Sequence, residues 1–103
     1  MNWSKTLLID LDNVIHDMNK GWKDGKLYGK PVRGALESIT RLQTHDFIVK
    51  VFTAREDLEP VRRWLKKYKI NCEVTNVKEG CLAIIDDRAI RFVNWEDTLR
   101  YFV

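Results

Sequence analysis

The short run at residues 6–11, Thr-Leu-Leu-Ile-Asp-Leu, constrains the fold of this chain more than any other segment. Its apolar residues are consecutive and do not alternate with polar ones, which is typical of a strand buried on both faces of a parallel sheet. Parallel strands need crossover connections, and helices usually supply them. The run therefore predicts an α/β fold.

Helical spacing, β-branched composition and turn signals predict the remaining elements. The three further strands are predicted at residues 47–52, 72–75 and 81–85. The three helices are predicted at residues 32–44, at residues 56–69 and from residue 94 onward. This order predicts a three-layer α/β/α sandwich around a mainly parallel sheet, in a single domain that spans residues 1–103. We expect Trp3, Trp64 and Trp95 to pack in or beside its core.

Composition is that of a folded globular protein, because 45% of the residues are hydrophobic and 32% are charged. This balance excludes a disordered tail, a collagen-like repeat and a coiled coil. The longest uncharged apolar run is far shorter than the roughly 20 residues that cross a bilayer, and the first residues lack the pattern of a signal peptide. We therefore expect a cytoplasmic protein without a membrane partner, in which Cys72 and Cys81 are reduced and packed.

Basic residues concentrate in one short stretch, since five of the 18 lie between positions 62 and 69. On a helix, the apolar residues of this stretch share one face, and the basic side chains occupy its flanks and outer side. A solvated helix face is the first interpretation. A contact with nucleic acid or polyphosphate is the alternative, and it predicts binding that weakens with salt.

Acidic residues follow two of the predicted strands at the point where each strand ends. Asp10 and Asp12 end the first strand, and Asp86 and Asp87 follow the last. The carboxyl ends of parallel strands meet at one edge of a sheet, so these acids should converge there, with Thr53 beside them. Four acids repel one another unless a cation lies among them, and oxygen ligands without His or Cys favour a hard ion. The sequence therefore predicts a Mg²⁺ site.

Four short motifs resemble those of the haloacid dehalogenase (HAD) superfamily. Residues 7–14 resemble its first motif, an apolar strand followed by Asp-x-Asp, and residues 51–55 resemble its second, an apolar strand followed by Thr. Residues 76–78 resemble the lysine of the third motif, and residues 84–89 resemble the acidic fourth motif. The motifs occur in the superfamily's order and span nearly the whole chain. The resemblance implies a HAD-like fold and a Mg²⁺-dependent phosphatase of the small bacterial or phage type.

The resemblance also implies catalytic roles for four residues. Asp10 would be the nucleophile that forms an aspartyl phosphate, and Asp12 would act as general acid and then as general base. Thr53 would hydrogen-bond a phosphoryl oxygen, and Lys78, rather than a lysine of the preceding helix, would offset negative charge. Asp12 can act as an acid only if its pKa is raised, which we expect from neighbouring carboxylates and partial burial.

Metal and substrate contacts follow from the same resemblance. Mg²⁺ would be held by Asp10, the backbone carbonyl of Asp12, Asp86 and, in a less direct way, Asp87. Position 13 usually carries Gly in the superfamily, and Asn can adopt the left-handed backbone that Gly would supply. The residues expected to bind the substrate are Thr53, Lys78, Asn13 and Arg55.

Many members of the superfamily carry a cap domain, for which this chain has no room. Residues 16–30 suffice only for a flap, and residues 56–76 only for a helix and a strand. An open site favours a large phosphorylated substrate or closure by a partner subunit, so a homo-oligomer is one expectation. Several flap residues have two interpretations: they touch the leaving group, or they are ordinary surface residues. These residues are His16, Trp22, Lys23, Lys26 and Tyr28.

The leading functional interpretation is a phosphomonoester hydrolase that acts through an aspartyl phosphate. One alternative is a phosphatase of nucleic-acid ends that docks its substrate on the basic helix. Another is a non-catalytic module that keeps the fold and binds phosphate or nucleic acid.

Overall fold

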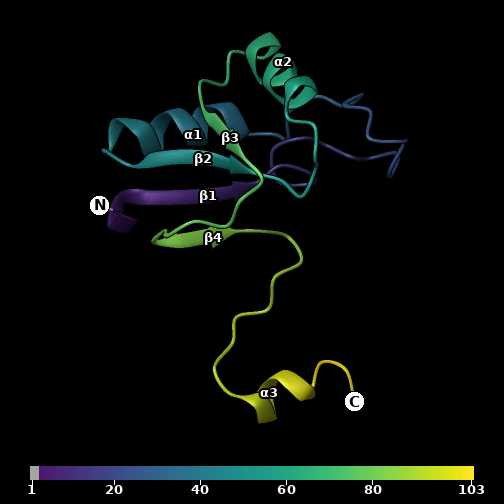
Figure 1. The fold of residues 1–103 in the computed structure, drawn as a ribbon, viewed down its shortest axis with the longest axis vertical. Helices are drawn as coiled ribbons and strands as arrows, with labels where there is room; N and C mark the ends of the chain where they lie inside the picture. The colour runs from purple at the N-terminus through teal and green to yellow at the C-terminus, as the bar shows by residue number, and fades with distance from the viewer. Residues whose placement is uncertain (1–2) are drawn as a thin grey trace.

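The computed structural model describes residues 3–103, and a four-stranded parallel sheet lies at its centre (Figure 1). The strands are β1 (Thr6–Asp10), β2 (Ile48–Phe52), β3 (Glu73–Thr75) and β4 (Ala83–Ile85). Their order in the sheet is β3-β2-β1-β4, and all three pairings are parallel. The predicted α/β class and the interior position of the first strand are therefore confirmed.

Two helices pack against the same face of the sheet. Helix α1 (Ala35–Thr44) connects β1 to β2, and helix α2 (Glu59–Lys67) connects β2 to β3. Ile39 of α1 and Leu65 of α2 belong to the same buried cluster as Val51 of β2. Two successive right-handed crossovers in one direction across a sheet place both helices on one face, as observed.

Left-handed residues set the helix boundaries inside the predicted ranges. Helix α1 begins at Ala35 rather than at residue 32 because Gly34 has a φ of 86°, which is not helical. Helix α2 ends at Lys67 because Lys69 has a φ of 60°, and the N–H of Ile70 donates to the carbonyl of Leu65 at 2.9 Å. This hydrogen bond is that of a Schellman C-cap.

The opposite face of the sheet has no packed helix among residues 3–103. The connection from β3 to β4 is a loop, and its Glu79 forms an ion pair with Lys50, whose side chain points away from the face that carries Val51. Helix α3 (Trp95–Leu99), which begins close to the predicted position and is capped by Asn94, has no buried residue and lies apart from the sheet (Figure 1). The described residues thus form the sheet and one helical layer of the predicted three-layer sandwich.

The three tryptophans that were expected to pack have different environments. Trp64 is buried, and its indole N–H donates to the carbonyl of Gly29 at 3.0 Å. For Trp3 and Trp95, which are 52% and 69% exposed, the prediction is wrong. Both lie on short terminal helices that contribute no buried residue to the core.

The remaining expectations concern the cysteines and membrane contact. Cys72 and Cys81 are free thiols of intermediate exposure, and burial raises the pKa of Cys72 to about 11. Within residues 3–103, no helix has the length and apolar composition that crossing a membrane requires.

The packing of α2 leads to a stability prediction. Leu65 is 2% exposed, so Leu65→Ala should lower the free energy of unfolding by about 2 to 5 kcal/mol through lost burial and a residual cavity. Urea unfolding followed by circular dichroism measures the change. The matched control Lys66→Ala alters the next, exposed position and should change stability by less than about 0.5 kcal/mol. Equal losses in the two variants would contradict the packing of α2.

Candidate active site

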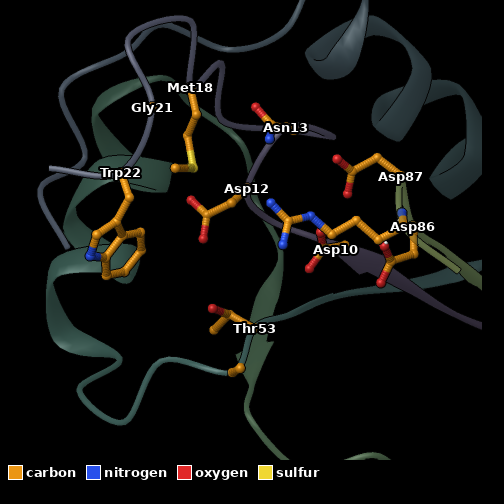
Figure 2. Close-up of a pocket in the computed structure, with 11 residues that line it drawn as sticks. Asp10, Asp12, Asn13, Met18, Gly21, Trp22, Thr53, Asp86 and Asp87 are labelled. Carbon is orange, nitrogen blue, oxygen red and sulfur yellow. Dashed lines mark hydrogen bonds between the residues drawn. The ribbon is translucent and has the colours of Figure 1, made fainter. Parts of the chain in front are cut away.

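A pocket of about 500 Å³ opens at the carboxyl edge of the sheet (Figure 2). Side chains at or just beyond the ends of β1, β2 and β4 line one part of it, and the flap lines another. The predicted site residues in its lining are Asp10, Asp12, Asn13, Thr53, Asp86 and Asp87. Sequence segments that are far apart therefore meet at the edge where they were expected.

Strand register brings the first and last acidic motifs together. Ile9 of β1 pairs with Ile85 of β4, so Asp10 and Asp86 follow at neighbouring positions. Asp10, Asp86 and Asp87 each offer a carboxylate oxygen, and these atoms lie within 4.8 Å of one another. The donor set is made of oxygen alone, which fits a hard divalent cation such as Mg²⁺.

The surroundings of Asp10 disfavour the ionised form of its carboxyl group. Burial raises its pKa to about 6 from the ordinary value of 3.8, with further contributions from the charges of Asp86, Asp87 and Asp12. A divalent cation among these carboxylates would remove the repulsion and favour the ionised form. The acids of this cluster therefore favour a cation beside them.

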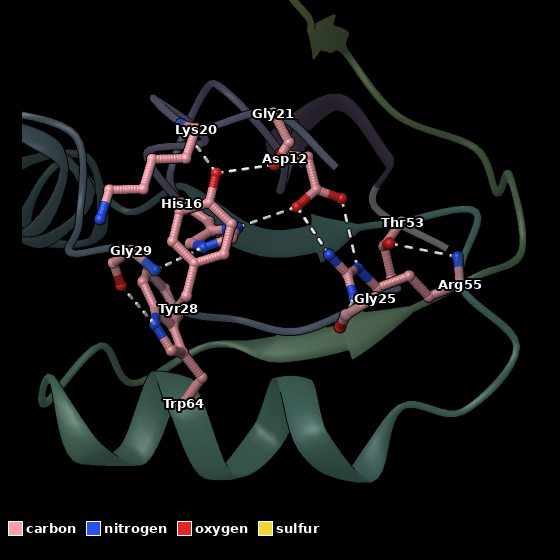
Figure 3. Close-up of polar contacts among 10 residues, drawn as sticks. All are labelled: Asp12, His16, Lys20, Gly21, Gly25, Tyr28, Gly29, Thr53, Arg55 and Trp64. Atoms are coloured by element: carbon pink, nitrogen blue, oxygen red, sulfur yellow. Dashed lines mark hydrogen bonds and ion pairs between the residues drawn. The ribbon is translucent and has the colours of Figure 1, made fainter. Parts of the chain in front are cut away.

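Asp12 lies outside the acidic cluster and is held by two basic side chains (Figure 3). Arg55 approaches both of its oxygens, with Nη2 at 3.0 Å from Oδ1 and Nε at 3.2 Å from Oδ2, and His16 Nδ1 lies 3.0 Å from Oδ1. Burial acts to raise the pKa of Asp12, but the hydrogen bonds from Arg55 and His16 outweigh burial and lower it. The expected upward shift was wrong because the hydrogen bonds from Arg55 and His16 outweigh the effect of burial.

His16 is the candidate residue whose position differs most from the sequence prediction. It is fully buried rather than on the flap surface, and its ring makes edge contacts with Tyr28 and Trp64. The backbone N–H of Gly29 donates to Nε2 at 3.0 Å, so the proton of a neutral ring lies on Nδ1 and is donated to Asp12. Its position four residues after Asp12 is the only sequence signal for this contact.

Asn13 allows the chain to turn directly after Asp12. Its φ of 68° is left-handed, as predicted from the replacement of the usual Gly, and its N–H donates to the carbonyl of His16 at 2.8 Å. The N–H of His16 in turn donates to the carbonyl of Leu11 at 2.8 Å. This tight turn brings the His16 ring behind the Asp12 carboxylate.

Thr53 and Arg55 follow β2 and have different partners. The Thr53 hydroxyl oxygen accepts the backbone N–H of Arg55 at 3.2 Å, so the hydroxyl proton can be donated into the pocket. The Arg55 guanidinium, expected to bind the substrate, instead contacts Asp12, the carbonyl of Gly25 and the ring of Trp22. Arg55 therefore connects the site to the flap.

Lys78 is not brought to the acids in this structure. The side chain of Lys78 is exposed and does not line the pocket. The next residue, Glu79, forms an ion pair with Lys50 of β2. The role suggested for Lys78 remains a prediction without support from this geometry.

Comparison with known proteins gives no independent assignment. No protein-family model, curated protein or solved structure matches this chain. The resemblance to the HAD superfamily therefore depends on the four motifs, and it stays a prediction.

The left-handed turn at Asn13 can be tested by substitution. Asn13→Ala should lower the free energy of unfolding by about 1 kcal/mol, because a β-carbon is disfavoured at a positive φ for residues other than Asn and Gly. Asn13→Gly should change it little, since Gly adopts this conformation readily. Urea unfolding compares the two variants, and an Ala variant as stable as the Gly variant would show that the turn is not left-handed.

The raised pKa of Asp10 predicts that this residue destabilises the metal-free protein. The folded chain holds the Asp10 proton more tightly than the unfolded chain, so stability is lost as the pH rises from about 4 to about 6 and stays lost above that. Asp10→Asn should therefore raise the melting temperature at about pH 8 in EDTA, and the gain should vanish near pH 4. Asp17→Asn, at an exposed position outside the pocket, is the control. A gain that is independent of pH would contradict the electrostatic cause.

Proposed function

We propose that this chain is a Mg²⁺-dependent phosphomonoesterase with Asp10 as its nucleophile. The observation that carries the proposal is the convergence of three carboxylate oxygens within 4.8 Å, in the same pocket as Asp12 and Thr53. A nucleophile, a second carboxyl group and a hydroxyl donor around a cation site are the groups that phosphate ester hydrolysis needs. The HAD-like order of the motifs agrees with this arrangement.

Asp10, Asp86 and Asp87 would hold the ion, and the backbone carbonyl of Asp12 remains an expected ligand. Bound Mg²⁺ would offset the repulsion between the Asp10 carboxylate and a phosphate dianion. The exposure of Asp86 and Asp87 leaves room for water and a substrate oxygen around the site.

In the first step, an Asp10 carboxylate oxygen attacks phosphorus, and the bond from phosphorus to the ester oxygen breaks. The Asp12 carboxyl group donates its proton to the departing oxygen, so that the leaving group is released as a neutral alcohol. The Thr53 hydroxyl donates a hydrogen bond to a phosphoryl oxygen. The product of this step is an aspartyl phosphate on Asp10.

In the second step, a water molecule attacks phosphorus, and the bond from phosphorus to Asp10 breaks. Asp12, now a carboxylate, accepts the proton of that water and returns to its starting state. The sum of the two steps is an ester and water giving an alcohol and inorganic phosphate, with both aspartates unchanged.

Arg55 connects substrate binding to the proton that Asp12 must carry. While Arg55 pairs with Asp12, the pKa of this carboxyl group is held low, so it does not carry a proton near neutral pH. Arginine also pairs strongly with phosphate, so a substrate dianion competes with Asp12 for the guanidinium. Transfer of Arg55 to a phosphoryl oxygen frees Asp12 to take up its proton.

A non-catalytic phosphate-binding module is the second candidate, and two observations favour it. Asp12 is held ionised by Arg55 and His16, and Lys78 lies outside the pocket. Such a module would bind Mg²⁺ and phosphate without cleaving an ester. Turnover therefore separates the two candidates.

The test is hydrolysis of p-nitrophenyl phosphate with Mg²⁺ and with EDTA. The wild-type chain should release p-nitrophenol only with the metal, and Asp10→Asn should reduce kcat by at least about a thousandfold because the nucleophile is lost. Asp17→Asn should retain activity, since its side chain is exposed and does not line the pocket. Binding of Mg²⁺ and phosphate by isothermal titration calorimetry, with no turnover of any ester in a broad panel, would refute the phosphatase and support the binding module.

A further inference from the structure

Trp22 is an aromatic side chain at the mouth of the pocket that the reaction proposed above does not use. It is 61% exposed and lines the pocket together with Met18, also from the flap. Figure 2 shows Trp22 and the metal-site acid Asp10 on opposite sides of the pocket, with Asp12 between them. More than half of the surface of this indole is therefore open to a ligand in the pocket.

The Trp22 ring is held in place before any ligand arrives. Arg55 lies over it, with the guanidinium carbon 4.8 Å from the ring centroid, and Arg55 is itself fixed by Asp12 and the carbonyl of Gly25. The flap segment before Trp22 is fixed as well, because the Tyr28 hydroxyl donates to the carbonyl of Gly21 at 2.7 Å (Figure 3). The Tyr28 contact does not involve Arg55, so it keeps the flap segment ordered when the guanidinium turns to the phosphate. A side chain on an ordered segment loses less conformational entropy when a ligand stacks on it.

The direction of the leaving group follows from the position of Asp12. In the proposed reaction, Asp12 protonates the ester oxygen that departs, so this oxygen must lie beside the Asp12 carboxyl group. The phosphoryl group lies on the Asp10 side of that oxygen. The rest of the leaving group therefore extends past Asp12 toward Trp22.

A nucleobase is the chemical group that fits this end of the pocket. Arg55 contacts the Trp22 ring, and the exposed part of the ring offers a flat π surface. Any of the nucleobases can stack on such a surface, because each has a π face. The volume of about 500 Å³ lies in the range of small-molecule sites, which is roughly 300 to 1,000 Å³. A simple sugar or alkyl phosphate has no aromatic ring to place there.

We infer that the pocket binds phosphate monoesters of nucleosides, with the phosphate at the acidic cluster and the base stacked on Trp22. This inference rests on the proposed function and adds its substrate class. A free mononucleotide and the phosphorylated end of a nucleic-acid strand share this chemistry, and the experiment below separates these sources.

Equilibrium binding to the Asp10→Asn variant with Mg²⁺ tests the inference. The variant keeps an oxygen ligand at position 10 and cannot form the aspartyl phosphate, so affinity is measured without turnover. Adenosine 5′-monophosphate should bind about 5- to 150-fold tighter than ribose 5-phosphate, which is the range that one stacked base provides. Adding Trp22→Ala should abolish this preference, and Trp22→Phe should retain most of it.

Trp95→Ala is the matched control, because Trp95 is similarly exposed but lies on α3 and does not line this pocket. It should leave the preference unchanged. A short oligonucleotide with a terminal phosphate that binds tighter than the mononucleotide, with an affinity that falls with salt, identifies a strand end as the source of the base. Equal or weaker binding of the oligonucleotide identifies the mononucleotide.

Two results overturn the inference: equal affinity for the nucleotide and the sugar phosphate, or a preference for the nucleotide that survives Trp22→Ala. Its failure differs from failure of the proposed function. Metal-dependent hydrolysis without a base preference overturns the inference alone. A base preference that requires Trp22, in a chain that hydrolyses no ester, overturns the phosphatase and leaves the nucleotide site in place.

Discussion

Repulsion between carboxylates at the carboxyl edge of the sheet is the constraint on which the site depends. The parallel pairing of Ile9 with Ile85 fixes the backbone positions of Asp10 and Asp86 as neighbours, so their carboxylates lie close together. The buried cluster formed by the sheet, α1 and α2 stabilises that register. Burial and the neighbouring charges raise the pKa of Asp10 to about 6, and a divalent cation is the species that would relieve the repulsion. The packing of the core thus keeps mutually repelling carboxylates close together, in a site that favours a cation.

Two residues further along the chain, Asp12 has the opposite electrostatic environment. Burial opposes ionisation at both positions, but Arg55 and His16 reverse the balance at Asp12 and lower its pKa. Different pKa shifts in adjacent carboxyl groups are a means by which enzymes give them different roles. In the proposed reaction, the raised pKa of Asp10 and the lowered pKa of Asp12 describe the protein before the metal and the substrate bind. The cation would favour ionised Asp10, and loss of Arg55 to the phosphate would favour protonated Asp12.

Sequence patterns predicted those parts of the structure that local residues determine. The apolar run of β1, the left-handed Asn13 and the Asn94 cap each follow from a few adjacent residues, and the acidic convergence follows from the rule that parallel strands end at one edge. The buried His16 and the Arg55 ion pair were not predicted, because both depend on the path that the flap takes in three dimensions. The expected helical layer on the second face also depends on tertiary packing, and α3 buries no side chain. The spacing of apolar residues in the sequence does not predict the contacts of the flap or the packing of a helix on the second face of the sheet.

The flap is held by polar contacts because it has few apolar residues with which to pack. The Trp64 indole of α2 donates to the carbonyl of Gly29, and the guanidinium of Arg55, in the loop after β2, donates to the carbonyl of Gly25. These contacts fix a loop that contains no helix or strand. Arg55 also contacts Asp12 and Trp22, and it thereby joins the proton state of the acid, the position of the flap and the orientation of the indole. In the proposed function, this loop would serve as the recognition surface for the leaving group. In the proposed reaction, phosphate binding and leaving-group recognition would share one guanidinium, so a change in either would affect the other.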